Sequence, residues 1–211
     1  MSALPVVFVV VSVASIVGLF AWVSRHPYCW IWHRYEPLAA PPSRRTLAWV
    51  AGLGVFVGVA CSTVLPGVLV PAALAASSSV LFLAADTDVR ERRVPAPPLW
   101  LAAAWGAAAW ALTSGDLITA FIPMAMAVVY FVFALTGHAG ASDYRLWVAI
   151  APAAGFISLV ASMALAVVFA VAYVVFAVVA RRRGTGVPVA VPVHLAWAAA
   201  ITITLLIPAA L

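Results

Sequence analysis

Uncharged apolar runs of about 20 residues recur along this chain, and they constrain its fold more than any other feature. Hydrophobic residues make up 67% of the sequence and charged residues only 8%, a balance that ordinary soluble domains do not have. A helix of about 20 apolar residues crosses the roughly 30 Å hydrocarbon core of a bilayer. We therefore expect residues 1–211 to form a single integral membrane domain.

Hydropathy predicts five spans in the first two thirds of the chain, followed by a longer apolar run. The five are Ala3–Val23, Thr46–Leu65, Gly67–Ala85, Pro97–Leu112 and Leu117–Thr136. The uncharged run 146–180 would be about 52 Å long as one helix, so it must fold back once, near Pro152 and Gly155. A last span covers Val187–Leu211. The expected fold is all-α, a polytopic bundle of about eight transmembrane helices.

The basic residues orient this bundle. Eight spans place all of them on one side of the membrane, which the positive-inside tendency identifies as the cytoplasm, so both termini are expected outside. They are Arg25, Arg34, Arg44, Arg45, Arg90, Arg92, Arg93, Arg145 and Arg181 to Arg183. The first span has no basic residue before it, which favours a retained anchor over a signal peptide. Loop 24–45 is a short basic cytoplasmic loop, too short for a domain.

Charge and cysteine placement limit the partners and cofactors. The net charge of +5 lies in loops between spans, which excludes a nucleic-acid partner and predicts contact with anionic membrane lipids. In loop 24–45, His26, Cys29 and His33 have metal-ligating side chains, but a fourth ligand is missing, so no metal site is expected. Trp30 and Trp32 in the same loop are expected to anchor at the membrane interface.

Two aspartates could carry chemistry at the cytoplasmic ends of spans. Asp88 follows the third span, and Asp143 lies at the mouth of the sixth. Two carboxyl groups about 3 Å apart cannot both ionise, so they share a proton. One can then take a proton from an attacking water while the other protonates the scissile carbonyl oxygen, without any metal or cofactor. Asp86 is expected to miss this site, because it points about 200° away from Asp88 on a helix.

The segments around both aspartates resemble the signatures of the prepilin peptidase family, the bacterial branch of the GxGD aspartyl proteases. In that family an Asp precedes a Pro by seven residues in patterns like D-x-R-x-R-R-I-P-N, a spacing that Asp88 and Pro95 share. The second signature is GxGD followed by a hydrophobic residue, Lys and Leu, which the stretch Gly140-Ala-Ser142-Asp143-Tyr-Arg145-Leu is similar to. The chain departs from the pattern at Ala96, Ser142 and Arg145.

The resemblance implies a fold, an activity and a substrate. It implies catalysis by Asp88 and Asp143, with Gly140, Ser142, Arg145 and Pro95 supporting the site or contacting substrate. The substrates implied are type IV pilin-like precursors, cleaved at the cytoplasmic border of the bacterial inner membrane. Because loop 24–45 lacks the two CxxC pairs of the long family members, N-methyltransferase activity is not expected.

Other interpretations stay open at this point. The chain could be a non-enzymatic membrane protein, either a degenerate peptidase acting in assembly or a small proton-coupled transporter that uses the two aspartates. His138 could tune the pKa of Asp143, and His194 could line a cavity or bond a neighbouring helix. The spacings from Gly54 to Gly58 and from Ala102 to Gly106 are helix-packing signals.

Overall fold

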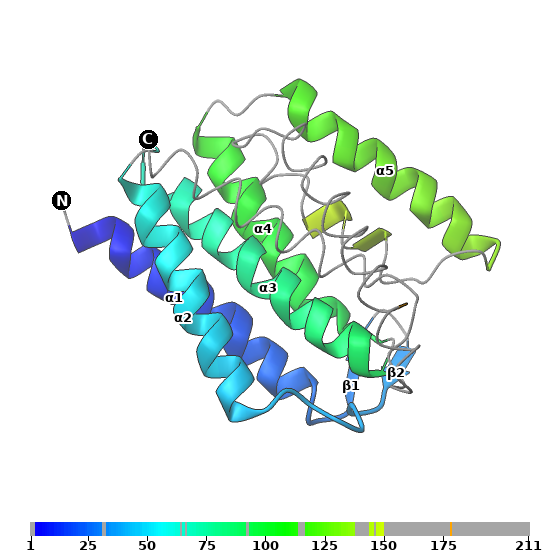
Figure 1. The fold of residues 1–211 in the computed structure, drawn as a ribbon. Coiled ribbons are helices and arrows are strands. Elements are labelled where there is room, and N and C mark those ends of the chain that lie inside the picture. The colour runs from blue at the N-terminus through cyan, green and yellow to red at the C-terminus, as the bar shows by residue number, and fades with distance from the viewer. Residues whose placement is uncertain are drawn as a thin grey trace.

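The computed structural model describes residues 3–30, 33–63, 65, 67–91, 93–113, 117–137, 144, 145, 147–149 and 178. Within these residues the protein is mostly helical, with one small antiparallel sheet (Figure 1). The elements are α1 (Ala3–Val23), β1 (Tyr28–Trp30), β2 (His33–Tyr35), α2 (Arg44–Ser62), α3 (Leu69–Glu91), α4 (Ala96–Leu112) and α5 (Leu117–Leu135). The all-helical expectation therefore holds in outline, and the sheet is an addition to it.

Two of the described helices are long and apolar enough to cross a membrane. They are α1, over Leu4–Val23, and α2, while α3 has a shorter apolar stretch over Leu69–Ala84. The three predicted spans after residue 145 lie outside the described residues, apart from a helical start at 147–149 and the helical residue Val178.

Helix α3 is the centre of the described bundle. It packs against α1, α2 and α4, and in Figure 1 it runs between them. All residues from Val70 to Leu81 are buried, on every side of the helix, and the small side chains among them let the neighbouring helices approach closely. A helix that is apolar all round is stable only when it is enclosed.

The approach of α2 depends on two glycines. A Cβ atom on Gly58 would lie 2.5 Å from Val9 Cγ1 of α1 and 2.9 Å from Ala75 Cβ of α3, and one on Gly54 would overlap Ser79 Oγ. The predicted packing role of this small-residue spacing is thus confirmed. The spacing from Ala102 to Gly106 in α4 also agrees with its predicted role in helix packing, because both residues are buried.

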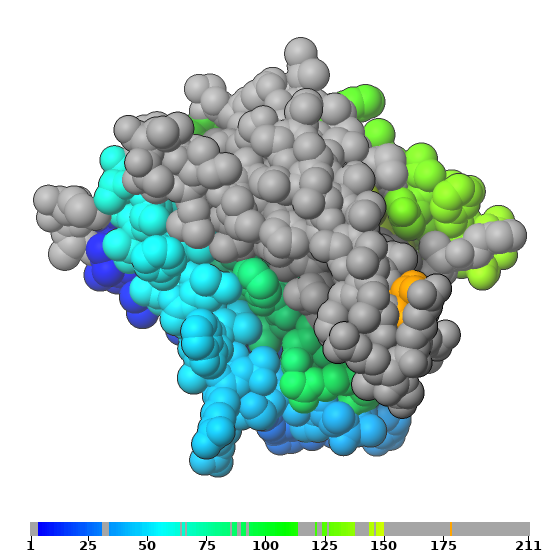
Figure 2. All heavy atoms as spheres, in the orientation of Figure 1, coloured from blue at the N-terminus to red at the C-terminus, as the bar shows by residue number. Residues whose placement is uncertain are grey.

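Large apolar side chains cover much of the outside of the described helices. Trp49 of α2 is 78% exposed, and α5 presents a row of exposed aromatic and aliphatic residues. In Figure 2 these two helices lie on opposite sides of the visible face, α2 in cyan and α5 in yellow-green. The exposed residues of α5 include Phe121, Met124, Val128, Val129, Phe131, Val132, Phe133 and Leu135. Such an exterior is suited to lipid and costly in water.

Loop 24–45 contains a β-hairpin that the sequence analysis did not predict. Strands β1 and β2 pair antiparallel, with Tyr28 opposite Tyr35 and Trp30 opposite His33. After the hairpin, the N–H of Leu38 donates to the carbonyl of Ser24 at 3.0 Å. Arg25 Nη2 donates to the carbonyl of Pro42 at 2.7 Å, so both ends of loop 38–42 are tied to the end of α1.

Candidate functional site

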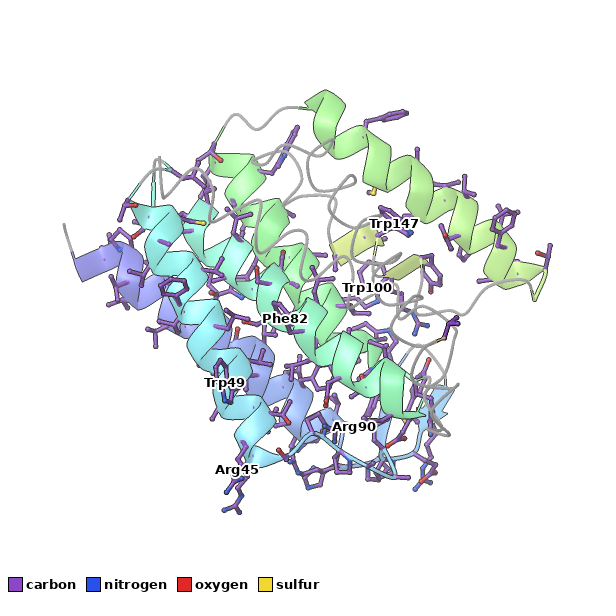
Figure 3. All side chains as sticks on the ribbon, viewed as in Figure 1. Arg45, Trp49, Phe82, Arg90, Trp100 and Trp147 are labelled. Carbon is purple, nitrogen blue, oxygen red and sulfur yellow. The ribbon has the colours of Figure 1, made fainter. Side chains whose placement is uncertain are left out.

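Six of the seven described arginines lie at one end of the bundle, which we call the arginine-rich end. It comprises the end of α1, the hairpin, the start of α2, the end of α3 and the start of α4. Figure 3 shows two of these arginines, Arg45 and Arg90, at that end. Its arginines are Arg25, Arg34, Arg44, Arg45, Arg90 and Arg93. This grouping agrees with the predicted orientation of the first four spans.

Asp88 lies in the last turn of α3, at the arginine-rich end. The third predicted span ends at Ala85, but the helix continues to Glu91, so Asp88 is held on helical backbone rather than in a loop. Thr87 supports this extension, because its hydroxyl donates to the carbonyl of Leu83 at 3.0 Å. The helical frame of the last turn therefore fixes the position of the Asp88 backbone.

Glu91 joins the last turn of α3 to the loop that follows the hairpin. Its Oε2 accepts a hydrogen bond from the backbone N–H of Ala39 at 3.1 Å, and its Oε1 accepts one from the N–H of Ala40. Hydrogen bonds to an ionised acceptor are stronger than neutral ones. The sequence alone predicted no role for Glu91.

Asp86 forms an ion pair with its neighbour one helical turn on. Arg90 Nη2 lies 2.6 Å from Asp86 Oδ1, and the Asp86 side chain is 21% exposed. Among the described residues, its second oxygen, Oδ2, is buried without a hydrogen-bond partner. A buried carboxylate oxygen without a partner is unusual, so Asp86 is the alternative candidate for the first catalytic acid. Any test of Asp88 must therefore include Asp86.

Pro95 and Ala96 follow Asp88 at the start of α4. Pro95 is buried and is the N-cap residue, with φ −60° and ψ 132°, but it offers no side-chain hydrogen bond to the helix. The backbone N–H of Ala96 lies close enough to the hydroxyl of Tyr28 in the hairpin to act to lower its pKa. The departure from the family pattern at Ala96 thus lies at a contact between α4 and the hairpin.

The second signature is described in part. Gly140, Ser142, Asp143 and His138 lie outside the described residues, as does His194. Arg145, two positions after Asp143, is helical and half-buried. Its Nε donates to the hydroxyl of Tyr144 at 3.1 Å. Gly137, with φ +76°, follows the end of α5.

Arg145 also contacts the hairpin. Burial acts to lower the pKa of Arg145, but hydrogen bonds with the hydroxyls of Tyr144 and Tyr35 outweigh it, and the pKa is raised. The guanidinium also lies close enough to Tyr28 to affect that residue's titration, as does the side chain of Arg93. Arg93, five positions after Asp88, and Arg145, two positions after Asp143, therefore both lie near Tyr28 of the hairpin.

The pKa of Tyr28 in the hairpin is shifted from its ordinary value. Burial raises the pKa of its hydroxyl, against the opposing effects of the Ala96 N–H, Arg145 and Arg93. From the sequence, two aromatic residues of the same loop, Trp30 and Trp32, were interpreted only as an interfacial anchor, and Tyr28 was given no role.

Two of the metal-like residues in loop 24–45, His26 and Cys29, have described surroundings. His26 stacks on Trp22, with ring centroids 5.6 Å apart, and its Nδ1 lies 3.0 Å from the carbonyl oxygen of Trp22. Cys29 is an exposed free thiol on β1. In the part of the chain that the structure describes, no three His, Cys, Asp or Glu side chains are grouped to hold a metal ion.

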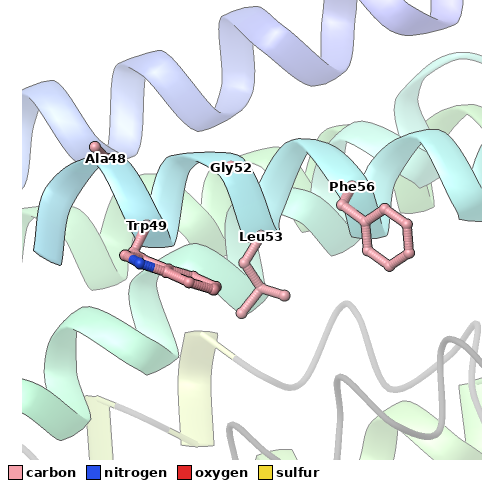
Figure 4. Close-up of a pocket in the computed structure, with 5 residues that line it drawn as sticks. All are labelled: Ala48, Trp49, Gly52, Leu53 and Phe56. Carbon is pink, nitrogen blue, oxygen red and sulfur yellow. The ribbon is translucent and has the colours of Figure 1, made fainter. Parts of the chain in front are cut away.

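A separate hollow lies along α2, away from these polar residues. It has a volume of about 480 Å³, and its described lining is one face of the helix (Figure 4). The lining residues are Ala48, Trp49, Gly52, Leu53 and Phe56. This described lining has no ionisable side chain, so it offers apolar surface and no group for catalysis.

No protein-family model, no curated protein and no solved structure matches this chain.

Proposed function

We propose that this chain is an aspartyl endopeptidase of the bacterial inner membrane that removes the leader from type IV pilin-like precursors. In this proposal about eight helices cross the membrane, both termini lie outside, and the arginine-rich end faces the cytoplasm. Asp88 and Asp143 are the catalytic pair, and no metal or cofactor takes part.

One observation carries the proposal. Two segments about fifty residues apart each resemble one signature of the prepilin peptidase family, and described residues two to eight positions after each aspartate lie close enough to Tyr28 to affect its pKa. Ala96 and Arg93 follow Asp88, and Arg145 follows Asp143. This convergence supports a shared site at the end of the bundle where a leader peptide would meet the membrane.

The chemistry requires only the two carboxyl groups and a water molecule. The ionised carboxylate accepts a proton from the water, whose oxygen attacks the scissile carbonyl carbon. The protonated carboxyl group gives its proton to the carbonyl oxygen, and the tetrahedral intermediate then collapses with release of the new amine. The shared proton keeps one group acidic and one basic at the same pH.

The proposed substrate fits the physical setting. A precursor with a short basic leader followed by an apolar helix would lie beside the enzyme, with its cleavage site at the membrane border. A peptide bond inside a helix is shielded from attack, so the border segment must unwind first. Unpaired backbone groups are tolerable there because water reaches this depth.

The experiment that tests the proposal follows leader removal in a host that lacks its own prepilin peptidase. The chain is co-expressed with candidate pilin-like precursors from the same genome, and loss of the leader is measured by mass spectrometry. Wild type is compared with Asp88→Asn and Asp143→Asn. Asp86→Asn is the matched control, because it alters an acid two residues away in the same helix.

We expect cleavage by wild type and Asp86→Asn, and none by the other two variants. Cleavage that survives both Asp88→Asn and Asp143→Asn rules out the peptidase proposal and leaves the non-enzymatic alternatives. Loss with Asp86→Asn but not with Asp88→Asn assigns the first catalytic acid to Asp86 instead.

A further inference from the structure

The hollow along α2 is built around one exposed glycine. Gly52 lies between Trp49 and Phe56, whose side chains are 78% and 59% exposed and project from the same side of the helix in Figure 4. A Cβ atom on Gly52 would meet nothing within 4 Å, so the space above this residue is open. The two aromatic side chains are about two helical turns apart. They therefore form the walls of the hollow, and the backbone at Gly52 forms its floor.

Gly52 has no packing role that would explain a glycine at this position. A glycine inside a helix weakens the helix relative to alanine. Gly54 and Gly58 offset this cost, because a Cβ atom on either would overlap a neighbouring helix. Gly52 points about 200° away from Gly54, toward the outside of the described bundle. What its missing side chain leaves there is the hollow.

A positive charge lies at one end of the hollow. Arg45, Trp49, Gly52 and Phe56 are spaced four, three and four residues apart, which places them on one face of α2. Figure 3 shows Arg45 at the start of the helix and Trp49 one turn further along. Arg45 is exposed. The described ion pairs lie at the hairpin and at the end of α3, so within the described residues Arg45 has no acidic partner.

Helix stability does not explain a cation at this position. The first turn of α2 contains no acidic residue, and a cation in the first turn of a helix opposes the helix dipole. An anion beside Arg45 would relieve this repulsion. Guanidinium groups bind phosphate particularly well. The mouth of the hollow therefore suits a phosphate group, while its walls suit an apolar chain.

The length of this face matches one leaflet of a bilayer. From Arg45 to Phe56 the helix rises about 16 Å, and half of a hydrocarbon core of about 30 Å is about 15 Å. An acyl chain that begins at a headgroup near Arg45 would therefore extend along the hollow as far as Phe56. Helix α2 is long and apolar enough to hold this face inside a membrane.

We propose that the hollow binds one anionic phospholipid, with its phosphate at Arg45 and one acyl chain along Trp49, Gly52 and Phe56. The charge at the mouth decides between this occupant and the apolar helix of a substrate, because the basic leader of a pilin-like precursor would be repelled there. The inference rests on the membrane location in the proposed function and does not depend on peptidase activity.

Photo-crosslinking tests the site without any assay of cleavage. Full-length protein in detergent is irradiated with phosphatidylglycerol that carries a diazirine in one acyl chain, and the labelled residues are located by mass spectrometry. We expect labels between residues 49 and 56. Their yield should fall when unlabelled phosphatidylglycerol is added, but not when the same amount of phosphatidylcholine is added. Equal competition by the two lipids overturns the anionic site.

A matched pair of arginine variants locates the headgroup. Arg45→Gln should raise the concentration of photoreactive lipid needed for half-maximal labelling about fivefold, the effect of one arginine near an anionic lipid. Arg44→Gln removes the same charge about 100° around the same turn, and should change that concentration little. Equal effects of the two variants would show only a general attraction to this basic end, and would overturn the site.

A matched pair of glycine variants locates the acyl chain. Gly52→Leu fills the hollow and should raise the concentration for half-maximal labelling about tenfold, as the loss of about two buried methylene groups predicts. Gly18→Leu is the control, because Gly18 is an exposed glycine of α1 whose added Cβ atom also meets nothing within 4 Å. Wild-type labelling of Gly52→Leu, or an equal loss in Gly18→Leu, overturns the position of the chain.

The same labelling separates this proposal from the others. Labelling that a purified pilin-like precursor displaces and phosphatidylglycerol does not would assign the hollow to the substrate helix and overturn the lipid site. Carbonate extraction of cell membranes tests the location that the site needs, and release of the protein overturns both that location and the site. A retained protein that is labelled between residues 49 and 56 but cleaves no precursor overturns the peptidase proposal alone.

Discussion

Glu91 and Ala39 are joined by a hydrogen bond of 3.1 Å, from the backbone N–H of Ala39 to Glu91 Oε2, although 52 positions separate them in the chain. The N–H of Ala40 binds the other carboxylate oxygen. Through this one side chain, the last turn of α3 and the loop after the hairpin become a single unit. The turn so fixed is the one that carries Asp88.

Replacement of Glu91 by alanine should destabilise the fold. Two backbone donors lose a charged acceptor, so we expect Glu91→Ala to lower the free energy of unfolding by about 1 to 2 kcal/mol, allowing for the partly exposed setting. Thermal unfolding in detergent measures the change. Glu36→Ala is the control, because Glu36 pairs with Arg34 at 3.8 Å with both side chains more than two thirds exposed, and should cost almost nothing. Equal losses in the two variants would contradict the role of Glu91.

Glycine substitutions in α2 should separate packing from helix propensity. Gly58→Ala should destabilise by about 1 to 3 kcal/mol, because the new methyl group overlaps Val9 and Ala75. Gly52→Ala meets nothing within 4 Å and should stabilise by up to about 1 kcal/mol. Thermal unfolding of the two variants is compared with wild type. A Gly58→Ala protein as stable as Gly52→Ala would show that α2 does not approach α1 and α3 this closely.

Thiol labelling should report the orientation of the arginine-rich end. Cys29 is exposed on the hairpin, whereas Cys61 is 2% exposed inside the bundle. A membrane-impermeant maleimide should therefore label Cys61→Ser protein in inverted vesicles and leave it unlabelled in intact spheroplasts. Cys29→Ser protein should stay unlabelled in both. Labelling of Cys29 in intact spheroplasts would reverse the proposed topology.

The stability of the protein at alkaline pH should depend on Tyr28. Burial raises its pKa in the folded state, whereas the unfolded chain titrates near the ordinary value of about 10. The folded protein holds this proton more tightly, so the stabilisation is complete below pH of about 10 and is lost as the pH rises through the folded-state value. The melting temperature of wild type should therefore fall relative to that of Tyr28→Phe as the pH rises above about 10. A difference that stays constant over this range would contradict the assignment.

Helix positions were largely predictable, because hydropathy depends on residue type alone. Both ends of the first span were predicted correctly, and α5 ends one residue before its predicted end. The end of α3 was not predicted correctly, because the predicted span ends at Ala85 and the helix ends at Glu91. Hydropathy marks where the apolar stretch stops, whereas the helix continues through Thr87 and the Asp86–Arg90 pair because their side chains bond within the helix.

The hairpin shows what a scan for membrane spans misses. The stretch 28–35 is rich in aromatic residues that favour strands, and Pro27 and Pro37 flank it, which is a usable strand signal. Its contacts with the start of α4 and with Arg145 had no such signal. They join residues far apart in the chain, and only the packed bundle brings these together. Whether Asp88 and Asp143 meet stays a prediction, since Asp143 lies outside the described residues.

The enclosure of α3 has a consequence for how the protein is made. This helix contains three consecutive buried serines, Ser77 to Ser79, and its apolar stretch is short for a bilayer crossing. Its surface suits protein neighbours better than lipid, so α3 alone should leave the translocon for the bilayer inefficiently. We expect its integration during synthesis to depend on α1 and α2, which emerge from the ribosome first and offer the surface that α3 needs.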